Sequence, residues 1–167
     1  MSESTLAKLF EHNNWANQKI IEVCSTLTDE QLDAPPQSAT EGSIRSTLLH
    51  LVSSQYGYLR LLTLPLEERR DSVDVEFADI DKSLKHSGEW LLELAKDTSK
   101  LPSTRIQSRN GYQFEPWVVM TQIINHATEH REQIKSMLTA LGVTPPDIDG
   151  WSYGDTVNAL VAPLEKD

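Results

Sequence analysis

Two histidines four residues apart, His126 and His130, form the sharpest chemical pattern in this 167-residue chain. Residues with this spacing lie on one face of an α-helix, about 40° apart around its axis, so both imidazoles can bind one metal ion. Neutral imidazole is a ligand for zinc, nickel, copper or iron. On the predicted helix, His130 faces the apolar side and His126 lies at its edge, which predicts a groove in the protein. The alternative is a pair of partly buried histidines without a metal.

A catalytic metal site of this kind needs a third protein ligand and an open position. The chain has three other histidines, which are His12, His50 and His86. His86 lies in a polar segment that predicts a solvated helix face, and His12 lies beside asparagines in the first predicted helix. His50 is surrounded by leucine and valine but points away from the main apolar stripe of its helix. From the residues alone, His50 is either a hydrogen-bonded core histidine or a metal ligand.

The segment His126-Ala-Thr-Glu-His130 also matches the inverted zinc-protease pattern H-x-x-E-H, in which Glu129 would be the general base. Those enzymes need a further acidic ligand downstream in a larger fold, and little of this chain follows His130. Glu129 lies on the side of the two histidines that faces away from the apolar stripe, so we expect it to be neither a ligand nor the base.

Cys24 fits a small core position better than a nucleophile.

Four long segments with helical periodicity must position these residues. They run from about Ser4 to Leu27, Ser43 to Leu62, Asp79 to Leu101 and Pro116 to Leu141. The connection at 63–78 is long enough to cross a whole bundle, so the second and third helices can run parallel. Asn110-Gly111 predicts a two-residue hairpin turn before the last helix. The sequence therefore predicts an all-α four-helix bundle with one long crossover and a small β-hairpin.

Local signals predict where these helices begin and end. Ser43 is a favourable N-cap, Pro116 is suited to the first position of a helix, and Gly142 is the expected C-terminal stop. The apolar stripes predicted to face the core include Trp90 and Trp117.

Composition restricts the class of protein. The formal charge of −10, from 15 basic and 25 acidic residues, argues against a nucleic-acid partner or an anionic membrane. The length fits one domain over residues 1–167, with the tail 143–167 packed on the bundle. The single cysteine, the lack of a signal-peptide pattern and the lack of an apolar run of about 18 residues predict a cytoplasmic protein.

Four segments spread over nearly the whole chain resemble a known family. They are Phe10-Glu-His-Asn-Asn-Trp-Ala-Asn, Ser43-Ile-Arg-Ser-Thr-Leu-Leu-His50-Leu, Ile124-Asn-His126-Ala-Thr-Glu-His130-Arg-Glu-Gln and Gly142-Val-Thr-Pro-Pro-Asp-Ile-Asp-Gly-Trp-Ser-Tyr. In this order and spacing they are similar to the DinB/YfiT-like superfamily of metalloenzymes. The resemblance implies an up-down-down-up bundle and a three-histidine metal site, in which His50 joins His126 and His130.

The resemblance also implies an activity. Zinc and nickel are metals of the superfamily, homodimers are common, and relatives include S-transferases and isomerases that use low-molecular-weight thiols. We therefore expect a metal-dependent enzyme that transfers a small thiol to a small electrophilic substrate. No thiol-binding residues are recognisable in the sequence. A metal-dependent hydrolase and a non-catalytic metal-binding or dimer-forming module in stress response remain as alternatives.

Overall fold

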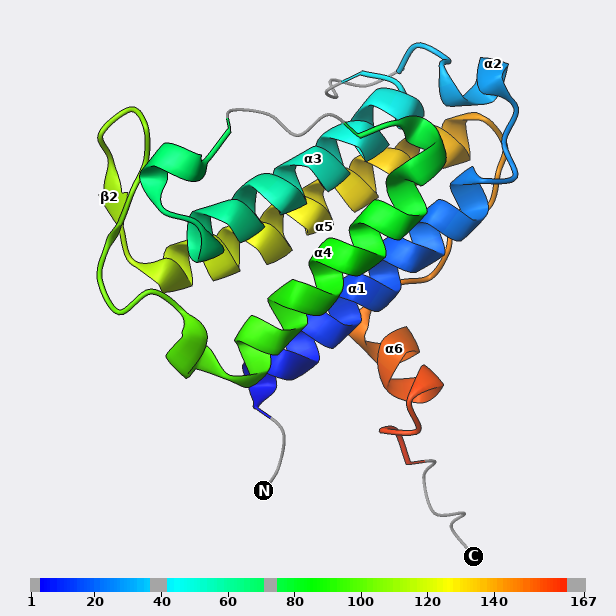
Figure 1. Cartoon of the computed structure of the whole chain (residues 1–167). Coiled ribbons are helices and arrows are strands. Elements are labelled where there is room, and N and C mark those ends of the chain that lie inside the picture. The colour runs from blue at the N-terminus through cyan, green and yellow to red at the C-terminus, as the bar shows by residue number, and fades with distance from the viewer. Residues whose placement is uncertain (1–3, 37–41, 71–74, 162–167) are drawn as a thin grey trace, which may run out of the picture.

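The computed structural model describes residues 4–36, 42–70 and 75–161, and this part of the chain is mainly helical. In this part, four long helices form a bundle (Figure 1). They are α1 (Thr5–Cys24), α3 (Ile44–Thr63), α4 (Ile80–Lys96) and α5 (Pro116–Ala140). The connections and the tail, where described, add two short helices, α2 (Asp29–Leu32) and α6 (Gly150–Thr156), and three 3₁₀ turns (Leu66–Glu68, Phe77–Asp79 and Thr98–Lys100). The predicted four-helix bundle is confirmed.

The directions of the four long helices match the predicted up-down-down-up arrangement. Figure 1 shows α3 and α4 running the same way, whereas α1 and α5 run the opposite way. Each of α1 and α3 packs against both α4 and α5. The segment between α3 and α4 is the long crossover, of which residues 71–74 lie outside the described part. This arrangement places α3, with His50, directly beside α5, with the other two predicted ligands.

The core divides into two apolar halves. One half contains residues from the C-terminal part of α1 and α5 and the N-terminal part of α3 and α4, among them Ile20, Leu48, Leu84 and Leu138. The other half contains residues from the opposite ends of the same helices, among them Phe10, Leu62, Leu91 and Met120.

A buried polar layer separates these halves and receives residues from all four helices. Arg131 Nη1 on α5 donates to Oδ1 of Asn13 and of Asn17 on α1, at 2.8 and 2.7 Å. Asn17 Nδ2 donates to Gln55 Oε1 on α3 at 3.4 Å, and Gln55 Nε2 donates to Ser87 Oγ on α4 at 2.8 Å. Such a network satisfies polar groups that burial would otherwise penalise. Because Arg131 follows the predicted ligand on α5 directly, the layer and that histidine lie at the same level of the bundle.

The predicted helix signals at Ser43, Pro116 and Gly142 are confirmed. The Ser43 side chain accepts a hydrogen bond from the Ser46 backbone, and Pro116 is the first residue of α5. Gly142 has a φ of 74°, a conformation that glycine adopts without strain. This turn allows the Val143 N–H to donate to the Leu138 carbonyl at 2.9 Å, which closes the helix end.

Two helices are shorter than predicted. Helix α1 ends at Cys24 rather than Leu27, because the hydroxyls of Ser25 and Thr26 donate to carbonyl oxygens of the last turn, at 2.8 Å each. Helix α4 ends at Lys96 rather than Leu101. There the Asp97 carboxylate accepts from the Ser99 backbone N–H at 3.2 Å and from the Ser99 hydroxyl at 2.6 Å, and a separate 3₁₀ turn begins. Side chains that compete for local backbone groups explain both differences.

The β-hairpin is confirmed, but its predicted two-residue turn is wrong. Strand β1 (Ile106–Gln107) pairs antiparallel with β2 (Gln113–Phe114). The Ser108 N–H donates to the Tyr112 carbonyl at 2.8 Å, so three residues form the loop. Gly111 supplies the left-handed residue of this loop, with a φ of 91°.

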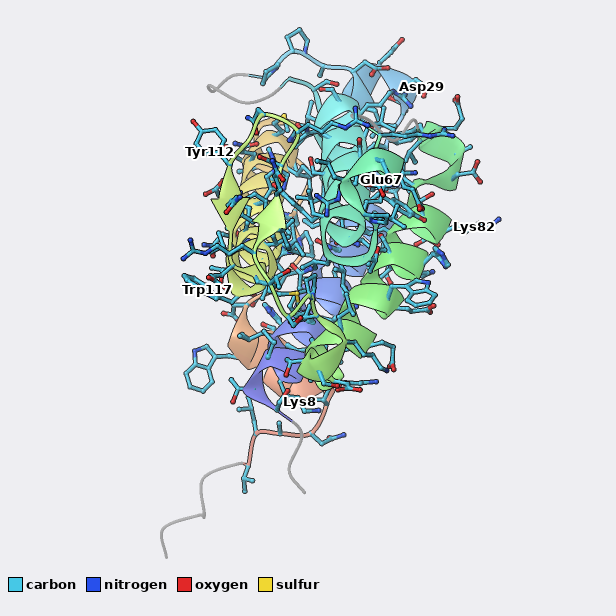
Figure 2. All side chains as sticks on the ribbon, turned by 60° about the vertical axis from the view of Figure 1, so that its left-hand side comes forward. Lys8, Asp29, Glu67, Lys82, Tyr112 and Trp117 are labelled. Atoms are coloured by element: carbon cyan, nitrogen blue, oxygen red, sulfur yellow. The ribbon has the colours of Figure 1, made fainter. Side chains whose placement is uncertain are left out.

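Two tryptophans lie outside the core, contrary to the prediction. Trp90 is 55% exposed and Trp117 is 65% exposed. Trp90 directly precedes Leu91, which fills the core, so its side chain points about 100° away around the helix. The buried stripe of α5 begins at Val119, and Figure 2 shows Trp117 on the outer side of this helix.

The beginning of the tail contacts α1. The His12 Nε2 lies 2.8 Å from the Ile148 carbonyl oxygen, and the Tyr153 hydroxyl donates to Glu11 at 3.2 Å. Within the described residues, no helix combines the length and the apolar character that crossing a membrane requires.

Candidate metal centre

The three histidines predicted as metal ligands lie together between α3 and α5. The Nε2 atom of His126 is 3.1 Å from the Nε2 atoms of both His50 and His130. One ring nitrogen from each histidine can be chosen so that all three lie within 4.8 Å of one another. Within residues 4–36, 42–70 and 75–161, this is the one group of three or more histidine, cysteine or carboxylate side chains that could hold a metal ion.

The helices explain how this cluster forms. His126 and His130 lie one turn apart on α5, and His50 reaches them from α3 because it faces α5 rather than the main core. His130 is buried, with 5% of its surface exposed. The other two histidines are half-buried. The predicted inward position of His130 and edge position of His126 are therefore confirmed, and two of the three histidines are partly accessible to solvent.

Gln133 fixes the orientation of one ring. Its amide Oε1 lies 2.8 Å from Nδ1 of His130, so the carbonyl oxygen accepts the Nδ1 proton. The Nε2 atom of His130 then presents a lone pair to the cluster. An outer hydrogen bond of this kind is typical of metal-binding histidines. Sequence analysis missed Gln133, although its spacing of three residues from His130 places both side chains on neighbouring positions of the helix surface.

The two short distances between the Nε2 atoms fit a metal ion. Two imidazoles on a tetrahedral zinc ion, with Zn–N bonds of about 2.0–2.1 Å, bring their nitrogens to about 3.3 Å from each other. The two contacts at His126, each 3.1 Å, are close to this value. If the rings are neutral, a single Nε2 proton on His126 cannot form two linear hydrogen bonds at once. A cation that binds three lone pairs satisfies all three nitrogens.

The electrostatics of the site keep His126 neutral. Burial, followed by the proximity of His130 and of His50, lowers the pKa of His126 from 6.5 to about 4. An imidazole must be neutral to bind a metal, so this shift leaves the lone pair of His126 available at neutral pH.

Glu129 does not join the cluster. It is exposed on α5 and is not part of the group that could hold a metal. The prediction that it is not a metal ligand therefore agrees with the geometry. The prediction that it is not a general base stays a prediction.

The remaining candidate side chains lie elsewhere. His86 is exposed, and His12 is bound to the tail through the Ile148 carbonyl. Burial raises the pKa of the Cys24 thiol to about 12, so Cys24 is a protonated core residue at neutral pH rather than a nucleophile.

Comparisons with known proteins bear on the family and the fold of the chain. The sequence profile of the DinB family matches residues 1–159. Protein DinB of Bacillus subtilis (strain 168) is 26% identical over 159 residues, which cover 87% of this chain and 91% of that protein. A crystal structure of a protein from Exiguobacterium sibiricum assigned to the DinB family superposes with a TM-score of 0.65. That match has 16% identity and covers 84% of this chain and 95% of the other, so it supports the fold.

Proposed function

The chain belongs to the DinB family, and we propose that it is a metal-dependent enzyme whose divalent ion is held by His50, His126 and His130. The observation that carries this proposal is the convergence of three imidazoles from two helices within 4.8 Å. Three protein ligands leave a coordination position for an added ligand, which is the arrangement of catalytic zinc sites, whereas structural zinc sites are closed by four protein ligands.

The proposed reaction is transfer of a low-molecular-weight thiol to a small electrophile. A zinc or nickel ion at this position would supply Lewis acidity and lower the pKa of a thiol or water placed beside it. The chain's own residues hold His126 neutral, orient His130 through Gln133 and cover His126 with the Tyr58 ring, whose centroid lies 5.6 Å away.

One feature of the chain favours a thiol from solution over water. The cluster that could hold the metal contains three histidines and no carboxylate. Cys24 is not that thiol, because burial raises its pKa to about 12. A thiol has an ordinary pKa near 8.5 and needs less help to lose its proton than water does. A nucleophile of this kind suits a site without a carboxylate base.

Metal-dependent hydrolysis is the second candidate, and the H-x-x-E-H pattern is the observation that favours it. The exposed position of Glu129 argues against this candidate. The third candidate is a non-catalytic role, in which the protein only binds the metal.

Thiol binding and turnover separate these functions. The protein would be loaded with Co(II), and its absorption spectrum would be recorded with cysteine, glutathione and 2-mercaptoethanol. We expect a sulfur-to-metal charge-transfer band, and thiol-dependent loss of electrophiles such as 1-chloro-2,4-dinitrobenzene. The His126→Ala variant should show neither. Hydrolysis of esters without any thiol would instead support the hydrolase, and a spectrum that no thiol changes, with no turnover, would support the non-catalytic module.

A further inference from the structure

Ser54 places a hydroxyl beside the histidine cluster. It lies on α3 one turn after His50, and its Oγ is 3.5 Å from Nε2 of His50. This nitrogen is the one that faces His126. The hydroxyl is therefore next to the centre of the cluster rather than behind the imidazole ring, and Ser54 is half-buried there.

The orientation of this hydroxyl differs from that of several other helical hydroxyls. Thr47, Thr63 and Ser87 each donate to the carbonyl oxygen four residues earlier, at 2.8 to 2.9 Å. This is a common arrangement for serine and threonine inside helices. Among the described residues, the hydrogen-bonding neighbour of Ser54 Oγ is instead Nε2 of His50.

Metal binding would change the partner of this hydroxyl. If the lone pair of His50 Nε2 binds the ion, that nitrogen can no longer accept a hydrogen bond from Ser54. The Oγ–H group is then available to donate to a ligand placed beside the cluster. The same face of α3 continues one turn further with Tyr58, whose ring contacts His126 edge-on. Thus α3 provides a donor and an aromatic wall on one side of the cluster.

We propose that Ser54 is a binding residue for the added ligand of this site, and that its hydroxyl donates a hydrogen bond to a small anion or thiolate beside His50. This inference rests on the proposed metal site. It assigns a specific task to a residue that is not a metal ligand itself. A hydrogen bond to a charged group is stronger than one between neutral groups, so its loss should weaken anion binding by about tenfold or more.

Azide binding to the Co(II)-loaded protein tests this role. Azide would be titrated at fixed pH and ionic strength, and the visible spectrum of Co(II) would report binding. Ser54→Ala is the test variant. Ser53→Ala is the matched control, because Ser53 is also half-buried on α3 but points about 100° away around the helix. We expect azide to bind about tenfold more weakly to Ser54→Ala than to the unaltered protein and to Ser53→Ala. Co(II) affinity and melting temperature should stay the same in all three.

Several results would overturn the proposal. They can be told apart from a result that removes the metal site itself. Equal azide affinity in Ser54→Ala and the unaltered protein would show that the hydroxyl does not contact the ligand. A parallel loss of Co(II) affinity would show that Ser54 acts on the metal instead. No azide binding to the Co(II)-loaded, unaltered protein would remove the anion site. If the unaltered protein takes up no Co(II), the proposed function fails, and this inference fails with it.

Discussion

The Nε2 atoms of His50 and His126 lie 3.1 Å apart, although 76 residues separate these histidines in the sequence. The contact joins α3 to α5 at the level where a buried polar layer replaces the apolar core. His130 adds a third Nε2 atom, also 3.1 Å from that of His126. One proton on His126 Nε2 cannot form two linear hydrogen bonds at once, and a cation bound by three lone pairs would satisfy all three nitrogens.

Replacing Gln133 by alanine should weaken metal binding by about 10- to 100-fold. The variant removes the acceptor for the Nδ1 proton of His130, so the ring loses its fixed orientation. Zinc affinity can be measured by competition with a chromophoric chelator. Gln122→Ala is a suitable control, because Gln122 is an exposed glutamine on the same helix. Equal zinc affinity in the two variants would mean that the outer hydrogen bond has no influence on the site.

Acid should destabilise the metal-free protein between about pH 6.5 and pH 4. The pKa of His126 is lowered to about 4 in the folded state, whereas the unfolded chain keeps the ordinary value of 6.5. In this interval the unfolded state binds a proton that the folded state does not bind, so the free energy of unfolding decreases as the pH decreases. Urea unfolding at pH 7, 5.5 and 4.5 measures this dependence.

His126→Asn is the comparison for the pH experiment, since asparagine does not titrate. Its free energy of unfolding should decrease less steeply over the same pH range. Identical slopes for the variant and the unaltered protein would contradict the lowered pKa of His126.

The exposed Glu129 should contribute little to any activity. A general base accelerates a reaction by about 10²- to 10⁴-fold. Glu129→Gln should reduce turnover severalfold at most, with metal still bound, because the side chain lies on the solvent side of α5. Steady-state kinetics and metal analysis of the same sample would measure both quantities. A loss of a hundredfold or more with full metal content would assign the base to Glu129 and favour the hydrolase.

Arg131 should be important for stability. Burial lowers its pKa to about 10, so it is still charged at neutral pH, and it is held by the amide oxygens of Asn13 and Asn17. Arg131→Met leaves both oxygens without their donor, and we expect the free energy of unfolding to fall by about 2–4 kcal/mol. Arg105→Met is the control. It removes an exposed ion pair with Glu115 and should cost about 1 kcal/mol or less. Similar losses in urea unfolding would contradict a structural role for the polar layer.

The sequence predicted most of the helices because their signals are local. Periodicity and caps depend on residues within a few positions of each other, as at Ser43 and Pro116. The errors at Leu27 and Leu101 arose where side-chain hydroxyls or a carboxylate compete for backbone groups. The prediction that Trp90 and Trp117 face the core was wrong. Apolar character alone does not show how much of a helix's apolar face the neighbouring helices cover.

Local sequence patterns predicted only part of the candidate site. The spacing of His126 and His130 predicts a shared helix face, but nothing within α3 tells whether His50 meets that face. This contact depends on the order of helices in the bundle, and it was predicted through the family resemblance. Gln133 and Ser54 were missed because glutamine and serine are common on helices and become informative only beside the cluster. The homodimer, the cytoplasmic location and the absence of a nucleic-acid partner stay predictions.

Metal analysis of the purified protein and its histidine variants decides whether the cluster holds an ion. Inductively coupled plasma mass spectrometry should find about one divalent ion per chain in the unaltered protein. His86→Ala is the control, because His86 is exposed and lies outside the cluster, and it should retain the ion. His126→Ala and His130→Ala should each lose most of it while remaining folded by circular dichroism. Full metal retention in both variants would show that these imidazoles do not form the metal site.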